Sequence, residues 1–167
     1  MIIGQHRRLF RLRSPRGLRF VYVHGKGLAL FTRRPFGKGE KVIALEGECV
    51  SARTATPEAV QVDERRFLDT RYLVPGDFIN HSCRPNLRLD IPGRRFVALR
   101  DIPADTEITY NYLTSEWDMR AFGTDFRCRC GARGCVGRVW GFRYLDRPER
   151  ERLKPLLSPF LLSKMAG

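Results

Sequence analysis

Three cysteines close together in the sequence are the residues whose types and spacing most directly suggest chemistry. The run CRCGARGC (128–135) places Cys128, Cys130 and Cys135 around two glycines, so a tight turn can direct three thiols to one centre. Tetrahedral zinc takes four nitrogen or sulfur ligands, so the run predicts a zinc site whose fourth ligand lies elsewhere. The candidates for the fourth ligand are Cys49, Cys83, His6, His24 and His81.

A second group of potentially reactive residues lies in FINHSCRPN (78–86), where a serine separates His81 from Cys83. A cysteine near a histidine is typical of nucleophilic catalysis, in which the imidazole takes the proton of the thiol. Three roles are therefore open for Cys83 at this point: an attacking thiolate, a metal ligand, or a small buried residue.

Composition limits the class of protein. The chain has 167 residues and is 43% hydrophobic, which suits a single domain with a core. No apolar run reaches the roughly 18–20 residues that cross a bilayer, and the start, MIIGQHRRLFRLRSPRG, has too short an apolar stretch for a secretory signal. An odd number of cysteines in such a chain argues against a disulfide framework. We expect an intracellular protein in a reducing compartment, without membrane contact.

The net charge of +13 is unevenly distributed. Residues 1–41 hold eleven Lys or Arg and one acid, and residues 127–167 hold ten and three. Residues 101–126 hold one base and six acids. The basic ends predict a possible contact with nucleic acid or another polyanion, although solubility alone explains them equally well.

Short strands and frequent turns account for most of the sequence. The β-rich stretches are residues 18–32, 36–50, 86–102 and 106–113, of which the first and third are predicted hairpins around Gly-Lys-Gly and Pro-Gly bends. Residues 56–68 are polar and irregular. Only residues 147–165 have helical character, and Pro155 and Pro159 would break or kink a long helix. The predicted class is mostly β with a helical end.

Four stretches resemble the signatures of the SET-domain protein-lysine methyltransferases. They are GKGLALF (25–31), FINHSCRPN (78–86), EITYNY (107–112) and CRCGARGC (128–135). They are similar, in the family's order, to its Gly-x-Gly stretch, Asn-His-Ser-Cys signature, Glu-Leu-Thr-Tyr-Asp-Tyr signature and post-SET cysteine loop. One Gly-x-Gly stretch is a weak signal, whereas four motifs in order are a specific one.

The resemblance implies a compact SET-domain β fold of small sheets, with the Asn-His and tyrosine segments threaded as a pseudoknot. The implied parts are a basic N-terminal lead (1–17), a SET domain (18–114), a post-SET zinc-binding segment (115–141) and a C-terminal helical extension (142–167). Composition alone would not indicate the threading, because knotted topologies are rare. Residues 51–77, which share little with the family, would form its inserted, substrate-facing region.

The resemblance also implies a role for Cys83, which would join Cys128, Cys130 and Cys135 as the fourth ligand of one structural zinc ion. Cys49 would then be a small buried residue. A thiolate held by zinc has no free role as a nucleophile, so the hydrolase interpretation is disfavoured. We further expect His81 and Cys83 not to face each other as base and nucleophile, because neighbouring side chains of an extended chain point to opposite sides.

The implied reaction is methyl transfer from S-adenosylmethionine to a lysine amine. The residues implied to bind the cofactor are Lys26, Gly27 and Leu28, through backbone groups, and Asn80, His81 and Tyr112. Tyr112 would bring its hydroxyl near the transferring methyl group, and Tyr110 would border the lysine amine. Either Trp140 or Phe142 would cover the adenine. A desolvating channel and the cofactor's positive charge would help to neutralise the lysine, so no strong protein base is required.

Three finer expectations follow from the resemblance. Tyr110 carries a hydroxyl that can hold water in the space of a further methyl group, so monomethyl-lysine is the expected main product. The acidic segment 101–126 is expected to form a negative rim around the lysine channel, with Asp63, Glu64, Asp69 and Asp77. Asn111 and Asp77 occupy positions where the family has aspartate and commonly arginine, which leaves the proposed core roles intact but the substrate unidentified.

The substrate class expected from the family is a basic protein that presents a lysine, such as a histone-like, nucleoid or ribosomal protein. The protein would then be cytoplasmic or associated with the nucleoid or chromatin. The alternative is a basic zinc-containing module that binds nucleic acid or chromatin without catalysis. Against it, the sequence shows no evident interleaving of aromatic and basic residues. Nothing in the sequence predicts the oligomeric state.

Overall fold

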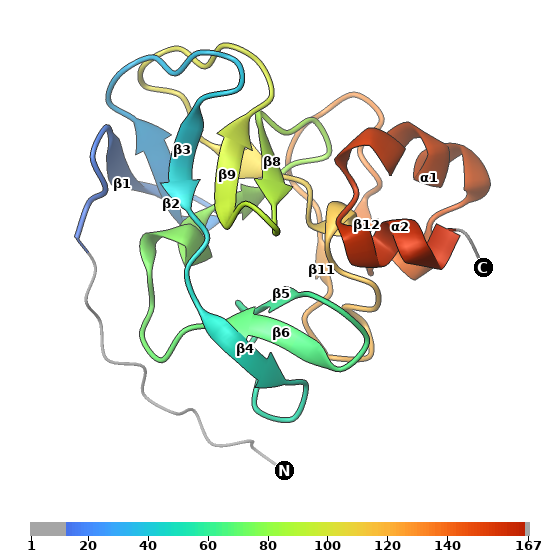
Figure 1. Ribbon diagram of the computed structural model, residues 1–167. Coiled ribbons are helices and arrows are strands. Elements are labelled where there is room, and N and C mark those ends of the chain that lie inside the picture. Colours follow the sequence, from blue (N-terminus) through green and yellow to red (C-terminus); the bar gives the residue numbers. More distant parts are fainter. Residues whose placement is uncertain (1–12, 166–167) are drawn as a thin grey trace.

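The structure is a computed structural model that describes residues 13–165. Residues 1–12 of the predicted basic lead, with His6, lie outside the described residues. The described chain forms five small sheets, and its two α-helices both lie near the C-terminal end. Figure 1 shows these helices at one side of the sheets, beside β12. The mostly β fold class is confirmed, and no helix in the described part is long and apolar enough to cross a membrane.

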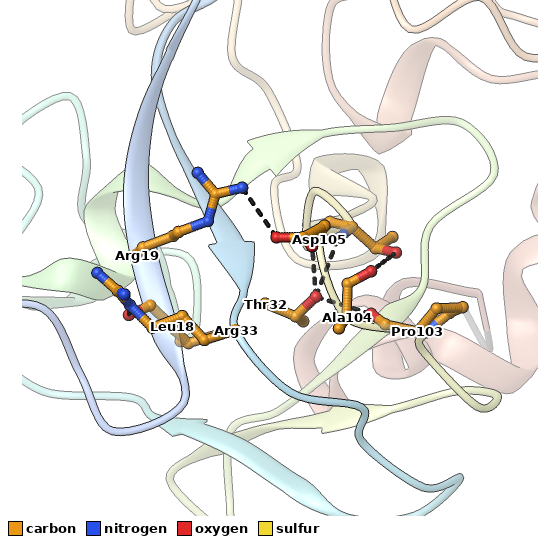
Figure 2. A network of polar contacts seen from close by, with 8 residues as sticks. Leu18, Arg19, Thr32, Arg33, Pro103, Ala104 and Asp105 are labelled. Atoms are coloured by element: carbon orange, nitrogen blue, oxygen red, sulfur yellow. Dashed lines mark hydrogen bonds and ion pairs between the residues drawn. The ribbon is translucent and has the colours of Figure 1, made fainter.

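The first sheet is the predicted hairpin of β1 (Leu18–Val23) and β2 (Gly27–Thr32), paired antiparallel from Leu18–Thr32 to Val23–Gly27. Gly27 has φ +87°, a conformation that glycine adopts without strain. Thr32 fastens the hairpin to the loop that leads towards the tyrosine motif, because its hydroxyl bonds the carbonyl of Pro103 at 2.7 Å. Arg19 pairs with Asp105 in the same network (Figure 2).

The second sheet has the order β3-β9-β8 and contains the other predicted hairpin. Its strands are β3 (Lys41–Ala44), β8 (Leu87–Asp90) and β9 (Arg95–Ala98). Alternation along β8 buries Leu87 and Leu89 on one face. These residues and Phe96 enter the main hydrophobic cluster, which also contains Tyr110.

The third sheet has the order β4-β6-β5 and corrects a prediction. Its strands are β4 (Glu48–Ser51), β5 (Val60–Gln61) and β6 (Arg66–Asp69). Residues 56–68 were expected to be irregular because they are polar, but β5 and most of β6 lie within them. Val60, Phe67 and Leu68 are buried, and their burial stabilises β5 and β6 although the surrounding residues are polar.

The second and third sequence motifs meet as a parallel strand pair, β7 (Asn80–His81) with β10 (Thr109–Tyr110). The buried side chain of Asn86 clamps this pair. Its Nδ2 donates to the carbonyl of Glu107 at 2.8 Å, and its Oδ1 accepts from the backbone N–H of Thr109 at 2.8 Å. The 3-10 helix η1 (Pro75–Phe78) precedes β7, and η2 (Tyr112–Thr114) follows β10.

The C-terminal part packs as a second hydrophobic cluster around the cysteine loop. Its elements are β11 (Phe126–Arg127), β12 (Arg138–Val139), η3 (Phe142–Tyr144), α1 (Arg147–Leu153), η4 (Lys154–Leu156) and α2 (Pro159–Met165). The helical tail is thus two short helices, because Pro155 and Pro159 interrupt it as expected. The backbone N–H of Ser158 donates to the carbonyl of Thr114 at 2.8 Å, which fastens α2 to the segment after the tyrosines.

Candidate functional site

The four cysteines named as zinc ligands are brought together by the fold. The thiol sulfurs of Cys83, Cys128, Cys130 and Cys135 all lie within 4.8 Å of one another. Cys83 Sγ lies 3.9 Å from Cys128 Sγ and 3.9 Å from Cys135 Sγ. Four sulfurs bound to one zinc at about 2.3 Å would be about 3.8 Å apart, so this geometry suits the metal. The thiol cluster could hold a zinc ion.

The electrostatics of the loop favour a thiolate at one cysteine. Burial raises the pKa of Cys83 and of Cys128. Although burial also acts on Cys130, backbone hydrogen bonds at Cys83 and Ala132 and bonds with the neighbouring thiols lower its pKa to about 6. A low thiol pKa suits a metal ligand, because the metal binds the deprotonated sulfur.

The expected separation of His81 from Cys83 is wrong. Residues two apart on a strand point to the same side, and His81 Nε2 lies 3.3 Å from Cys83 Sγ. The other ring nitrogen, Nδ1, accepts the backbone N–H of Tyr112 at 3.2 Å, so Nε2 carries the proton that faces the sulfur. Burial lowers the pKa of His81 to about 4, so the ring is neutral at neutral pH. This arrangement suits a hydrogen-bond donor to a metal-bound thiolate.

The remaining candidate ligands lie elsewhere. Cys49 was expected to be buried, but it lies exposed on β4. His24 is exposed in the turn between β1 and β2. Within the described residues, neither belongs to the thiol cluster.

The first and third motifs meet at Glu107, which the sequence did not single out. Its Oε2 pairs with Lys26 Nζ at 2.6 Å, and its Oε1 accepts from Asn80 Nδ2 at 3.0 Å. A Cβ placed on Gly27 would meet nothing within 4 Å, so the space beside this backbone is open. A cation, a carboxylate and an amide therefore lie together next to open space at the end of the β1–β2 hairpin.

Tyr112 lies where the two hydrophobic clusters meet, packed against both. Its hydroxyl donates to the carbonyl of Ile79 at 2.8 Å, and burial raises its pKa well above the ordinary tyrosine value. The rings of Tyr110 and Tyr112 are 4.7 Å apart. Phe126 packs edge-on against His81 at 5.7 Å and Tyr112 at 5.9 Å. The sequence motifs did not indicate that Phe126 would contact these two residues.

Both tyrosines line a cavity of about 1350 Å³. Residues of 52–60 and 67–77 form much of its wall, so the poorly matching segment does face the cavity. Burial raises the pKa of Tyr110, and a hydrogen-bonding contact with the Ser115 hydroxyl opposes that rise. The phenol of Tyr110 therefore remains protonated at neutral pH.

The acidic residues of the cavity are only in part the ones expected, because Asp69 and Asp77 line it but most of segment 101–126 does not. The described acidic residues that line it are Glu46, Glu58, Asp69, Asp77 and Glu116, with Arg53 as the basic one. Of segment 101–126, only Glu116 is among them. Asp105, Glu107, Asp118 and Asp125 pair instead with basic side chains. Asp63 and Glu64 line a separate, smaller pocket with Lys164.

Two departures from the family pattern have local structural roles. The Oδ1 of Asn111 accepts the backbone N–H of Leu113 at 3.0 Å and caps η2. Asp77 Oδ2 accepts the backbone N–H of Val74 at 3.0 Å in η1. Each side chain satisfies a backbone donor at a turn, which fits its place beside the tyrosine and Asn-His segments.

The two aromatic candidates for the adenine differ in exposure. Phe142 is fully buried in the second cluster, whereas Trp140 is 36% exposed and packs edge-on against Tyr144. Arg120 and Arg138 lie over the Trp140 ring at 5.2 and 5.9 Å. The fold thus assembles the aromatic and basic residues whose interleaving was not evident in the sequence.

Comparison with known proteins gives the family. The SET domain model matches residues 27–113, more than half of the chain. The chain therefore belongs to the SET-domain family. It is 32% identical over 92 residues to "Methyltransferase flvH" of Aspergillus flavus, a match that covers 54% of this chain and 49% of that protein.

Other relatives are larger proteins. The chain is 41% identical over 87 residues to the "Histone-lysine N-methyltransferase, H3 lysine-4 specific" of Emericella nidulans, covering 46% of this chain and 7% of that protein. A crystal structure of KRYPTONITE with mCHG DNA and SAH superposes with a TM-score of 0.61 at 25% identity, over 74% of this chain and 29% of that one. The chain spans about half or less of the length of the curated relatives named here.

Proposed function

We propose that this protein transfers a methyl group from S-adenosylmethionine to a lysine side chain of a protein. The observation that carries the proposal is the position of Tyr110 and Tyr112, adjacent in the wall of a large cavity and joined through β10 to the Asn-His segment. The named relatives are methyltransferases, and the KRYPTONITE structure contains SAH.

The residues beside the first motif suit the amino-acid end of the cofactor. That end carries one ammonium and one carboxylate, and Glu107, Lys26 and Asn80 offer groups of both signs and an amide. The open space lies beside the backbone of Gly27, between Lys26 and Leu28, and His81 of the second motif packs against Phe126. When bound, the cofactor supplies an activated methyl group.

The tyrosines have separate tasks in this proposal. Tyr112 is held by its hydrogen bond to the Ile79 carbonyl and aligns the groups at the methyl-transfer end of the cavity. Tyr110 borders the lysine amine, with its hydroxyl contacted by Ser115. Alignment of two reacting groups supplies much of the rate in a displacement at carbon. Small shifts of either ring should therefore lower the rate of methyl transfer.

The acidic wall of the cavity favours a cationic substrate. Four of its five acidic residues lie in the segment between β3 and η1 or within η1, and attraction of a lysine-bearing basic peptide follows from Coulomb's law. One relative is named for H3 lysine 4, and one KRYPTONITE structure contains an H3(1-15) peptide. A histone-like or other basic protein is the proposed substrate, and association with chromatin or a nucleoid follows from it.

Monomethyl-lysine is the proposed main product. Tyr110 and Phe96 both line the cavity with their rings 5.2 Å apart, and a water held by the Tyr110 hydroxyl would occupy the space of a further methyl group. Replacing Tyr110 by Phe should shift the product towards dimethyl- and trimethyl-lysine, as read by intact mass over time. Abundant trimethyl product from the unaltered protein would contradict this role.

Calorimetry tests the proposed activity before any substrate is known. S-adenosylmethionine should bind at about one site per chain, and transfer of its labelled methyl group to protein lysine should follow. Absence of binding would contradict the proposal.

A non-catalytic module that binds nucleic acid is the second candidate function. The arginines around Trp140 and Tyr144 favour it, because exposed aromatic rings amid basic groups can stack on bases. Tight, strongly salt-dependent binding of single-stranded RNA or DNA, without cofactor binding, would select this candidate.

A further inference from the structure

Glu116 is the acidic residue of the cavity wall that follows the tyrosine segment. It follows the tyrosine motif by four residues and lines the same cavity as Tyr110 and Tyr112. Its backbone N–H donates to the Tyr112 carbonyl at 2.9 Å, and its own carbonyl accepts from Phe142 N–H at 2.8 Å. The backbone on both sides therefore fixes where this side chain begins.

One oxygen of the Glu116 carboxyl is held by the protein. Oε1 accepts from the Ser115 hydroxyl at 3.0 Å and from the backbone N–H of Gln61 at 3.2 Å. The Gln61 side chain in turn accepts the N–H of Trp117 at 2.9 Å. Glu116 is thus anchored between β5 and the segment after η2.

The other oxygen is available to a ligand. Oε2 makes no hydrogen bond to another described residue, and no buried side-chain nitrogen or oxygen among the described residues lacks a partner. Oε2 therefore retains accessible surface, and the surface to which Glu116 contributes is the cavity. An oxygen with free lone pairs at this cavity can accept a hydrogen bond or a proton from a cationic group that enters it.

Glu116 is also connected to the tyrosine that borders the amine. The fully buried Ser115 hydroxyl donates to Glu116 Oε1 at 3.0 Å, and Ser115 lies close enough to Tyr110 to oppose the rise of the pKa of the phenol. Tyr110, Ser115 and Glu116 are therefore polar neighbours.

We propose that Glu116 is the proton acceptor for the target lysine. This inference rests on the proposed function. Oε2 accepts one proton from the lysine ammonium, so an N–H bond breaks and an O–H bond forms. The freed electron pair on nitrogen then forms the new C–N bond as the methyl group leaves sulfur, whose bonding pair stays on the thioether. The carboxyl later releases its proton to solvent.

The environment of Glu116 matches it to this task. Burial raises its pKa to about 7, against the opposing hydrogen bonds from Gln61 and Ser115. The difference between its pKa and the lysine pKa of about 10.4 is therefore about half of the difference for an ordinary glutamate. The charged or titratable groups that share the wall are Tyr110, Tyr112, Glu46, Glu58, Asp69, Asp77 and Arg53.

A direct titration tests the assignment without relying on activity. Carbon-13 NMR of glutamate-labelled protein with bound S-adenosylhomocysteine should show one carboxyl that titrates near pH 7. That signal should be absent from Glu116→Gln, which keeps Oε1 as an acceptor. A Glu116 carboxyl that titrates below pH 5 overturns the proposal.

Kinetics tests the transfer itself, with labelled S-adenosylmethionine and core histones as the acceptor. The wild-type rate should rise with pH around a midpoint near 7, and Glu116→Gln should lose that midpoint and at least about 100-fold in kcat at pH 7. Glu58→Gln, which removes a charge from the same wall, should keep the midpoint. The deficit of Glu116→Gln should shrink with an H3 peptide whose target amine is less basic than that of lysine.

The outcomes separate the two proposals. If wild type and Glu116→Gln show the same rate and the same midpoint, Glu116 is not the acceptor although the methyltransferase remains. If the wild-type protein neither binds the cofactor nor transfers a methyl group, the proposed function fails and the acceptor role fails with it.

Discussion

Tyr112 is the residue at which the two parts of the molecule meet, since it packs against both hydrophobic clusters and bonds the Ile79 carbonyl through its hydroxyl. Its motif made it a candidate from the sequence, because the tyrosines of EITYNY have family counterparts. Glu116 had no such signal. An acid in a segment of six acids looks solvated, and only the fold shows which one lines a cavity.

Removal of the Tyr112 hydroxyl should affect turnover more than cofactor binding. In Tyr112→Phe the ring still packs, but the bond to Ile79 that aligns it is lost. Interactions that matter most in the transition state act on kcat. We expect a loss in kcat of about 10-fold or more, with a dissociation constant for S-adenosylmethionine within about threefold of wild type. Equal losses in both, or none, would count against the alignment role.

The raised pKa of Glu116 also predicts how stability depends on pH. The folded protein keeps a proton to about pH 7, while the unfolded chain releases it near 4.5. Stability therefore falls as pH rises between these values. The glutamine of Glu116→Gln does not ionise. The difference in the free energy of unfolding, variant minus wild type, should therefore be up to about 3 kcal/mol larger at pH 8 than at pH 4.

Urea unfolding of both proteins at pH 4 and pH 8 measures this difference. Gln61→Ala leaves the carboxyl in place and is a suitable comparison, because it should retain the wild-type dependence on pH. If the free energy of unfolding of Glu116→Gln differed from that of the wild type by the same amount at both pH values, the Glu116 carboxyl would have an ordinary pKa.

At the scale of elements, the four cysteines come from two segments far apart in the sequence. Cys83 follows β7 and the other three lie between β11 and β12. The three-thiol loop indicated that a fourth ligand was needed, the resemblance to the family implied Cys83, and the fold brings the four thiols together. The exposure of Cys49 was not predictable, because the local sequence does not specify which side chains of β4 the rest of the fold covers.

Loss of one thiol should release the metal. Cys83→Ser is expected to bind well below one zinc per chain by elemental analysis and to unfold at a lower temperature, because metal binding contributes to folding. Cys49→Ser is the matched control and should keep one zinc. Full zinc in Cys83→Ser would exclude Cys83 from the ligand set.

The stability of the β7–β10 strand pair should depend on the Asn86 side chain. Asn86→Ala leaves the buried carbonyl of Glu107 and the N–H of Thr109 without their partner, and each such loss costs about 1–3 kcal/mol. We expect a destabilisation of about 2–5 kcal/mol in urea unfolding. Replacement of exposed Arg88 by Ala, on neighbouring β8, should cost less than about 0.5 kcal/mol. Equal effects would contradict the clamp.

At the scale of the whole molecule, the uneven charge has a structural explanation. Acids of segment 101–126 pair with bases from both ends of the described chain, as Arg19 with Asp105 and Arg143 with Asp118 show. The hairpins at 18–32 and 86–102 were predictable from alternation and turn residues. The acidic cavity was not, because much of its wall is built by residues 52–60, by β6 and by η1, whose arrangement no local pattern specifies.

The central claim is the transfer of a methyl group to protein lysine. Incubation of the protein with isotopically labelled S-adenosylmethionine and core histones, followed by mass spectrometry of the digested acceptor, measures it directly. The account predicts labelled monomethyl-lysine as the main product, at a level that Tyr112→Phe strongly reduces. Absence of labelled lysine from the histones and from a whole-cell lysate used as acceptor, with no binding of the cofactor, would contradict it.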